Sequence, residues 1–399
     1  MELSHKFTHC KHLNRCKYKN IGANINFKKT EPFDKNITCI VSMIYNNNNI
    51  YVAGCDDGTV IMFNIFNNRV RIIKTEQLEN DNSPINSIAI GRDHVVVCDN
   101  NGNIFYVSKL TLSEWKQSEC DIDIKLTSII YDFDNYRYLA VGNNGTLIYS
   151  EDLTNEWNNI EINIDNNLNC IFYDSYNEYY IVCGDNIIMY ASTNEFTNAS
   201  KWYQKGDTNI IYNQVAYNVC DNVFIAVGNN GYIGYISNLN ALQWERSDTG
   251  LSMPRLNNNE LAENSKDIMS ISYDIHNHLY YAITNKGNII STENLTNTWM
   301  EHKLISETSS LKCILYNHYI GMDLIIGNGF ILYGNMKNHI VRNRRILSEI
   351  SFIYPIGSSI TSTKDINPYC YLGIGKWENV NTTLNIPESK PEYTFIRIE

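Results

Sequence analysis

The chain has 399 residues, a formal net charge of -11 and a sequence pI of about 5.3. This acidic balance argues against nucleic acid as the main partner, because binding to phosphates requires clustered Lys and Arg. No apolar run approaches the about 18 residues that a membrane-spanning helix requires, so no membrane insertion is expected.

Residues 1–36 are polar and mildly basic, and we predict that they form an N-terminal arm. They lack the apolar stretch of a signal peptide, so the chain is expected to be made in a cytoplasm and to leave it, if at all, inside a particle. Five possible zinc ligands occur in this arm: His5, His9, Cys10, His12 and Cys16. Their spacing fits no zinc module, so no metal ligand is predicted, and zinc binding by this cluster stays an alternative.

Seven copies of one pattern, a short apolar run followed by a polar turn, occupy residues 37–342. Their anchor positions are Gly54, Cys98, Gly142, Gly184, Gly228, Thr284 and Gly327. These positions are 44, 44, 42, 44, 56 and 43 residues apart. A period in the low forties that is built of short strands and tight turns is typical of a β-propeller. We therefore predict an all-β, seven-bladed propeller with N- and C-terminal extensions.

The third copy shows how one repeat builds a blade. Alternating residues 126–131 predict a first strand, and the nearly continuous apolar run 138–142 predicts a second strand buried on both faces. The Asn-Asn-Gly at 143–145 predicts a hairpin turn, because Asn-Gly accepts positive φ. Residues 146–150 predict the third strand, and Trp157 opens the fourth.

Two copies depart from this pattern. The fourth lacks the turn glycine, so Asn186 is expected to take the left-handed conformation. The sixth arrives about 12 residues late, and the excess includes the loop 250–260. Long loops on rigid scaffolds often carry function. Two interpretations stay open for this loop, a partner contact and a tolerated insertion.

A tryptophan follows the third strand of five copies at a similar distance: Trp115, Trp157, Trp202, Trp244 and Trp299. We predict that these rings pack between blades, whereas a carbohydrate-stacking role would require them to be exposed on one face. Several of the 11 Cys also fall at strand positions, among them Cys39, Cys98, Cys170, Cys183 and Cys313. Free buried thiols in a reducing compartment fit this placement better than a disulfide framework does.

Residues 343–399 are predicted to form a C-terminal arm with strand-like pieces at 350–354 and 393–398. Basic residues precede it at Arg342, Arg344 and Arg345. A terminal strand often completes a propeller ring, but this arm is longer than ring closure requires. We therefore expect residues 1–36 and 343–399 to dock onto other proteins of a larger assembly.

The segment Ser150-Glu-Asp-Leu-Thr-Asn-Glu-Trp157 resembles the Asp-box of sialidase-type propellers, S-x-D-x-G-x-x-W, with Thr154 in place of Gly. The resemblance covers the propeller part of the chain. It implies the fold of BNR-type and photosystem-assembly-factor-type propellers, and of similar repeats in phage tail proteins. In that family the Asp-box is a structural turn remote from the active site.

Sialidase chemistry would need three arginines that clamp a carboxylate, a Tyr–Glu pair and an acidic residue. The arginines within the repeats are Arg69, Arg71, Arg92, Arg137, Arg246 and Arg255. None lies in the Arg-Ile-Pro setting that the family uses. We therefore predict no enzyme activity and no catalytic, cofactor-binding or metal-binding residue.

The frequent Asn, Ile, Tyr and Lys have AT-rich codons, so the composition indicates an AT-rich genome. Together with the two arms, this leads us to predict a non-enzymatic structural or interaction protein. We place it in a phage virion, as part of the tail, baseplate or neck, with binding of a host-surface glycan or protein as a further role. The alternatives are a cytoplasmic propeller scaffold or hub, and a divergent, sialidase-like glycosidase.

Overall fold

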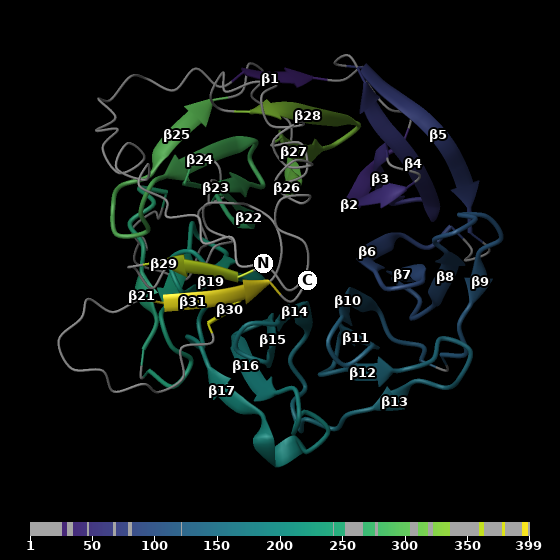
Figure 1. Ribbon diagram of the computed structural model, residues 1–399, viewed down its shortest axis with the longest axis horizontal. Helices are drawn as coiled ribbons and strands as arrows, with labels where there is room; N and C mark the ends of the chain where they lie inside the picture. Colours follow the sequence, from purple (N-terminus) through teal and green to yellow (C-terminus); the bar gives the residue numbers. More distant parts are fainter. Residues whose placement is uncertain are drawn as a thin grey trace, which may run out of the picture.

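The computed structural model describes residues 26–29, 35–45, 48–66, 69–78, 82–120, 122–241, 243–251, 266–275, 278–303, 310–317, 322–335, 359–362, 377–379 and 393–397. Seven four-stranded antiparallel sheets surround a central channel, which confirms the seven-bladed, all-β propeller (Figure 1). The helical content of these residues is a single 3-10 turn, η2 (Ala199–Lys201). The His/Cys cluster of residues 5–16 lies outside the described residues.

Blades 1 to 7 follow one another in chain order, and each begins at the channel. The first strands are β2 (Ile37–Tyr45), β6 (Ile85–Ile90), β10 (Leu126–Asp132), β14 (Leu168–Asp174), β18 (Tyr212–Asn218), β22 (Ile268–Asp274) and β26 (Leu311–Asn317). The second strands are β3 (Asn48–Cys55), β7 (His94–Asp99), β11 (Arg137–Gly142), β15 (Tyr179–Gly184), β19 (Val223–Gly228), β23 (Leu279–Thr284) and β27 (Met322–Gly327). First strands of neighbouring blades contact one another all round the ring.

The outer half of each blade has a third and a fourth strand. The third strands are β4 (Thr59–Phe66), β8 (Ile104–Ser108), β12 (Leu147–Ser150), β16 (Ile187–Ser192), β20 (Ile233–Ile236), β24 (Asn288–Thr292) and β28 (Phe330–Asn335). The fourth strands of blades 1 to 6 are β5 (Arg69–Gln77), β9 (Lys116–Gln117), β13 (Asn158–Asn159), β17 (Tyr203–Lys205), β21 (Glu245–Arg246) and β25 (Met300–Lys303).

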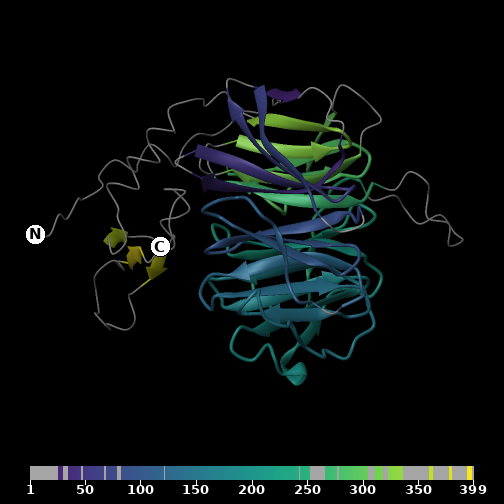
Figure 2. The same cartoon turned by 90° about the vertical axis from the view of Figure 1, so that its right-hand side faces the viewer.

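Blade 7 takes its fourth strand from the other end of the chain. Strand β1 (Asn26–Lys29) pairs antiparallel with β28, so that Asn26 lies opposite Asn335. The ring is therefore closed by residues that we had assigned to the N-terminal arm of 1–36. A separate three-stranded sheet contains β29 (Ser359–Ser362), β31 (Tyr393–Arg397) and β30 (Trp377–Asn379). Figure 2 shows the ring from its edge, with this small sheet beside one of its faces.

The turns between second and third strands have the backbone that their sequence predicts. Asn144 and Gly145 have φ of 54° and 67°, as a two-residue hairpin turn with positive φ at both positions requires. In the fourth copy, Asn186 takes φ 62°, which confirms that it replaces the missing glycine. Strand β11 is buried at all six residues, in agreement with a strand covered on both faces.

Each junction between neighbouring blades has its own hydrophobic cluster, so the core is a circle of seven interfaces. Each of the five tryptophans that follow a third strand belongs to one of these clusters or packs against it, which confirms that the rings lie between blades. The eight described cysteines are free thiols: Cys55, Cys98 and Cys183 are buried in second strands, and Cys39, Cys170 and Cys313 are partly buried in first strands.

Side chains at the start of the first strands bind the next blade directly. Asn86 Nδ2 donates to the carbonyl oxygen of Leu126 at 2.6 Å, and Asn169 Nδ2 donates to that of Tyr212 at 2.9 Å. One residue further along, Ser128 Oγ accepts from the N–H of Ile171 at 3.3 Å. These bonds satisfy backbone groups that the strand bulges leave unpaired, and they link the inner strands around the channel.

Because every blade repeats the same antiparallel order, all turns between first and second strands lie on one face of the ring, which we call the mouth face. Strand β28 ends on this face at Asn335, and β1 begins beside it at Asn26. Both predicted arms are therefore attached to the propeller on the mouth face. Within the described ranges, no helix is long and apolar enough to cross a membrane.

Candidate functional site

The mouth face carries a repeated Tyr-Asp or Tyr-Asn dipeptide at the end of the first strand in five consecutive blades. The tyrosines are Tyr131, Tyr173, Tyr217, Tyr273 and Tyr316, and all are partly buried. We name these five residues the mouth tyrosines. The following acid or amide is buried in each blade: Asp132, Asp174, Asn218, Asp274 and Asn317.

The buried Asp or Asn holds the turn that follows it. Asp132 Oδ1 accepts from the N–H groups of Asp134 and Asn135 at 3.0 and 2.9 Å. Asn218 Oδ1 accepts from the N–H of Cys220 at 2.9 Å. Short polar side chains that bond to the backbone two residues ahead favour tight turns, so the dipeptide fixes where each first strand ends.

At three junctions, the buried Asp or Asn also bonds to a tyrosine of the next blade's second strand. Tyr180 in blade 4 donates its hydroxyl proton to the carboxylate of Asp132 in blade 3. Tyr280 in blade 6 bonds to Asn218 in blade 5, and Tyr51 in blade 1 accepts from Asn317 in blade 7 at 3.1 Å. We call this contact the tyrosine latch.

The latch tyrosine is replaced by Phe224 in blade 5 and by Asp323 in blade 7, so the junctions of blades 4 and 5 and of blades 6 and 7 lack the latch. Asp323 lies opposite Tyr316, the register position that Tyr180 and Tyr280 occupy in their own blades. Its side chain has no exposed surface, and neither carboxylate oxygen has a hydrogen-bond partner among the described residues. Burial, together with the nearby charge of Asp274, raises the pKa of Asp323 well above its usual range.

The mouth tyrosines are held by stacking and by their own hydroxyls. Tyr217 packs on Phe224 and Tyr273 on Tyr280, with 4.7 Å between ring centroids in both pairs. The Tyr217 hydroxyl donates to Asn222 Oδ1 at 2.6 Å, and the Tyr273 hydroxyl lies 3.0 Å from His278 Nδ1. The rings therefore present apolar faces, while these two hydroxyls already have partners.

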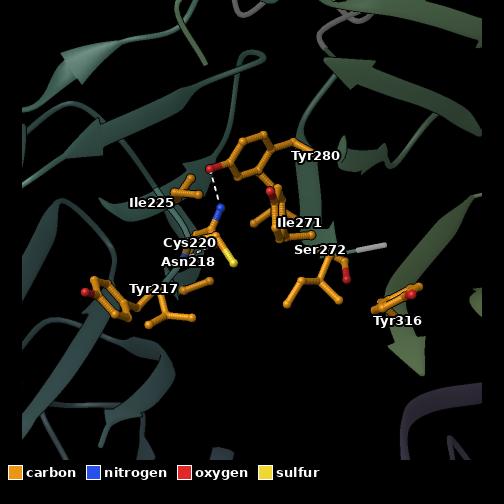
Figure 3. A pocket seen from close by; sticks show the side chains of 12 residues that line it. Tyr217, Asn218, Cys220, Ile225, Ile271, Ser272, Tyr280 and Tyr316 are labelled. Atoms are coloured by element: carbon orange, nitrogen blue, oxygen red, sulfur yellow. Dashed lines mark hydrogen bonds between the residues drawn. The ribbon is translucent and has the colours of Figure 1, made fainter. Parts of the chain in front are cut away.

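A pocket of about 240 Å³ opens among the mouth tyrosines of blades 5 to 7. It is lined by Ala216, Tyr217, Asn218, Val219, Cys220, Ile225, Ile271, Ser272, Tyr273, Ile275, Tyr280 and Tyr316. Figure 3 shows Tyr217 and Tyr316 on opposite sides of the pocket, with the bond between Asn218 and Tyr280 on its wall. The walls are therefore mainly aromatic and aliphatic.

The pocket exists because two adjacent blades have small residues where others have large ones. The residue before the mouth tyrosine is Ala216 in blade 5 and Ser272 in blade 6. At the equivalent register position, blades 3, 4 and 7 have Ile130, Phe172 and Leu315. These larger side chains pack against the clusters of their own junctions, so the space that they fill stays open between blades 5 and 7.

The mouth face of blades 3 to 6 is acidic. Its turns carry Asp134, Glu151, Asp152, Glu156, Glu178, Asp221 and Glu293, all of them exposed. Lys201 lies near this side and forms an ion pair of 2.9 Å with Glu195. The field at the mouth therefore favours positively charged groups of a partner.

Two phenols of the mouth, Tyr173 and Tyr280, lose their protons less readily than an ordinary tyrosine. Burial raises the pKa of Tyr173, and its bond to Asp134 raises it further. Burial and the adjacent Asp221 raise the pKa of Tyr280 in the same way. A tyrosine that acts as a nucleophile would need the opposite shift, because the phenolate is the attacking species.

The structure does not bring the described arginines together into a carboxylate clamp. Arg137 is buried, donates to the Tyr180 hydroxyl at 2.8 Å and to the Thr193 carbonyl at 3.0 Å, and belongs to the junction of blades 3 and 4. Arg92 of blade 2 lies over the ring of Tyr136 in blade 3. Arg246 lies over the ring of Tyr232 within blade 5. Arg71 lies on the outer strand β5, and Arg69 begins that strand. Arg255 and the rest of the loop after residue 251 lie outside the described residues.

The Asp-box-like segment forms a compact turn on the outside of blade 3. Asp152 Oδ1 accepts from the N–H of Thr154 at 2.9 Å, a bond that lowers the pKa of Asp152, and Ser150 Oγ donates to the Asp152 carbonyl at 2.7 Å. Trp157 donates from Nε1 to Ser118 Oγ of the preceding blade at 2.9 Å. Within the described residues, no group of three or more His, Cys, Asp or Glu is placed to hold a metal ion.

The mouth tyrosines were not among the residues singled out from the sequence. The signal was nevertheless present, since the Tyr-Asp or Tyr-Asn dipeptides recur at 131, 173, 217, 273 and 316 with the period of the repeat. The pocket had no such signal, because it depends on residues of three blades that are far apart in the chain.

No family model matches the chain, and no curated protein is similar to it in sequence. The resemblance to Asp-box repeats therefore stays a prediction. Solved structures match the fold: YCF48 bound to D1 peptide has a TM-score of 0.60 and 14% identity, and the match covers 79% of this chain and 97% of that one.

Two further structures extend this comparison. YCF48 from Cyanidioschyzon merolae has a TM-score of 0.59 and 11% identity over 78% of this chain and 99% of that one. The β-propeller domain of Cps50 (Swd1) from Myceliophteria thermophila has a TM-score of 0.57 and 10% identity, over 77% and 98%. At these identities the likeness shows the fold alone: this chain is a seven-bladed β-propeller.

Proposed function

We propose that this protein is a non-enzymatic interaction protein, which docks a segment of another protein on the mouth face. The observation that carries the proposal is the set of mouth tyrosines, which occupy one register position in five consecutive blades. Aromatic-lined clefts with few available polar groups suit protein segments. A glycan would need hydrogen-bonding groups, and the hydroxyls of Tyr217 and Tyr273 already have partners.

The similar structure of YCF48 bound to D1 peptide supports the proposal only by analogy of fold, because function lies in the site and not in the scaffold. The non-enzymatic part rests on this chain's own groups. Its described arginines are dispersed, and the pKa values of Tyr173 and Tyr280 at the mouth are raised. Hydrolysis of fluorogenic sialosides by the purified protein would overturn that part.

A photo-crosslinking experiment tests the docking face. p-Benzoyl-phenylalanine replaces Phe133 or Tyr176, which are aromatic residues of mouth-face turns, and in a control it replaces Lys286 on the opposite face. We expect irradiation in the source cells to give one discrete adduct from the two mouth positions and none from position 286. Adducts from position 286 alone would place the interaction on the other face and refute the proposal.

We further propose that this protein is part of a phage virion, as a component of its tail, baseplate or neck. The AT-rich composition and the two arms support this proposal. The corresponding measurement is the copy number of this chain in purified phage particles, relative to the major capsid protein. A fixed low multiple supports a tail, baseplate or neck component. Absence of the chain from the particles would favour a cytoplasmic scaffold. That result would not contradict the proposal that the mouth face docks a protein segment.

A further inference from the structure

The pocket between blades 5 and 7 has a size that points to one side chain. Pockets for whole small molecules measure about 300–1,000 Å³. This one measures about 240 Å³ and is half open, so it suits a single side chain that a longer ligand inserts. Its walls contain Ile225, Ile271 and Ile275 together with the tyrosine rings, so the matching side chain is aliphatic.

The polar atoms of Tyr217, Asn218 and Tyr280, which line the pocket, already have hydrogen-bond partners. The Tyr280 hydroxyl bonds to Asn218 and to Asp221, and the Tyr217 hydroxyl bonds to Asn222. An inserted polar group would therefore lose its water without gaining an equivalent bond, which disfavours sugars and acidic side chains. An aliphatic side chain incurs no such loss.

The charged residues on the mouth face indicate which charge the residues on either side of the inserted side chain should carry. Asp221, which follows the pocket residue Cys220, is exposed on the turn of blade 5, and Glu178 and Glu293 are exposed on the same face of the ring in blades 4 and 6. Among the described residues of the turns between first and second strands in blades 4 to 6, the basic candidate is His278, which is engaged with Tyr273. Carboxylates around an apolar pocket attract Lys and Arg.

We infer that the pocket takes one large aliphatic side chain, such as that of Leu, from an extended segment of a partner protein in which Lys or Arg flanks this residue. This inference rests on the proposed function and names the partner's chemistry. The acidic, apolar mouth and the single-residue pocket together select a basic segment with one aliphatic anchor.

The test uses the full chain with 13C-labelled isoleucine methyl groups, because three isoleucines line the pocket. The probes are nine-residue peptides with Leu or Gly at the centre and Lys or Glu on both sides. We expect the Lys-flanked Leu peptide to shift the methyl signals of Ile225, Ile271 and Ile275. Ile88 lies at the junction of blades 1 and 2, and Ile129 lies at the junction of blades 2 and 3. Their methyl signals should not shift.

Replacing the central Leu by Gly should weaken binding about tenfold or more, because a buried aliphatic side chain contributes at least that much. Glu flanks should abolish the shifts, and added salt should weaken the Lys peptide. Equal binding of the Gly or the Glu peptide would overturn the inference. So would the absence of shifts with the Lys-flanked Leu peptide at millimolar concentration.

Two variants fill the pocket with side chains that the same fold already accepts at that position. Ser272→Leu copies Leu315 of blade 7, and Ala216→Phe copies Phe172 of blade 4. Both should abolish peptide binding, whereas Ser42→Leu, on the first strand of blade 1, should not. If the crosslinked partner still docks on Ser272→Leu with unchanged affinity, the mouth face holds as the docking surface and the pocket inference fails.

Discussion

Asp323 places a carboxylate at the register position where Tyr180 and Tyr280 form the tyrosine latch. At the equivalent position, the Tyr180 hydroxyl donates to Asp132 and the Tyr280 hydroxyl accepts from Asn218, whereas Asp323 brings a second carboxylate towards Asp274. Two buried carboxylates cannot both ionise at low cost, so Asp323 is held protonated over part of the usual pH range.

This arrangement predicts that the contribution of Asp323 to the free energy of unfolding falls as the pH rises, the reverse of the usual behaviour of a carboxylate. An unfolded Asp has a pKa of about 3.9, and the folded value is raised. The folded state therefore binds more protons, so the stability from this group is full below about pH 4 and is lost as the pH rises through the folded pKa. Asp323→Asn should be more stable than the parent at pH 8, by about 1–3 kcal/mol, because its amide donates to Asp274 without a charge.

Chemical denaturation at pH 5 and pH 8 measures this difference. Asp132→Asn is the control, because Asp132 accepts from Tyr180 and lies 3.5 Å from Arg137, and it should lose stability instead. A gain for Asp323→Asn that does not grow with pH would contradict the assigned protonation.

Gly145 and Gly250 distinguish two reasons why a position requires glycine, a positive φ and a close approach of another atom. Both have nearly the same positive φ, 67° and 66°. A Cβ at Gly145 would lie 2.0 Å from the carbonyl oxygen of Ile164, whereas at Gly250 no atom of the described residues lies within 4 Å. Gly250→Ala should cost about 1 kcal/mol for its backbone alone, and Gly145→Ala should cost more, about 2–4 kcal/mol in total. Equal melting temperatures for the two variants would show that the close approach to Ile164 is absent.

At the scale of the elements, the outer strands are short and depend on side chains to hold them. Strand β9 has two residues, and Ser118 follows it directly. Ser118 Oγ accepts from Trp157 Nε1 at 2.9 Å and donates to the Leu153 carbonyl at 2.6 Å. Ser247 makes the same two bonds, with Trp299 and the Leu295 carbonyl, between blades 5 and 6. A serine after the fourth strand thus fastens one blade to the next.

Ser118→Ala should destabilise the protein by about 1–3 kcal/mol, because it leaves a buried N–H and a carbonyl without partners. Ser237→Ala, at an exposed serine after a third strand, should change stability by less than about 0.5 kcal/mol. Urea unfolding of the two variants gives both values. A Ser118→Ala variant as stable as the Ser237→Ala variant would mean that the serine is not a fastening point.

At the scale of the whole molecule, β1 decides whether the ring is closed. Without it, β28 would be an exposed edge strand, and blade 7 would have three strands. Deletion of residues 1–25 should leave the melting temperature unchanged. Deletion of residues 1–29 should lower it by at least about 2 °C, because the loss of a strand costs more than about 1 kcal/mol and each kcal/mol shifts the melting temperature of a domain of this size by about 2 °C. Equal melting curves for the two deletions would show that closure is not needed.

Much of this architecture could be predicted from the sequence, because the repeat is local. The blade number, the strand order within a blade, the left-handed Asn186 and the tryptophans between blades all depend on patterns within about 45 residues. The mouth tyrosines followed the same period and could have been found by aligning the copies on the residue before the first turn.

Other features were decided only by the tertiary structure. The ring closes with residues 26–29, because a strand from the other end of the chain pairs with the open edge of β28. The pocket forms because Ala216 and Ser272 are 56 residues apart but belong to adjacent blades, so that two small side chains open one space. Asp323 faces Asp274 for the same reason. The strands of one blade follow from the sequence of one repeat. The contacts between two blades depend on how the blades pack together, and the sequence of a single repeat does not contain that information.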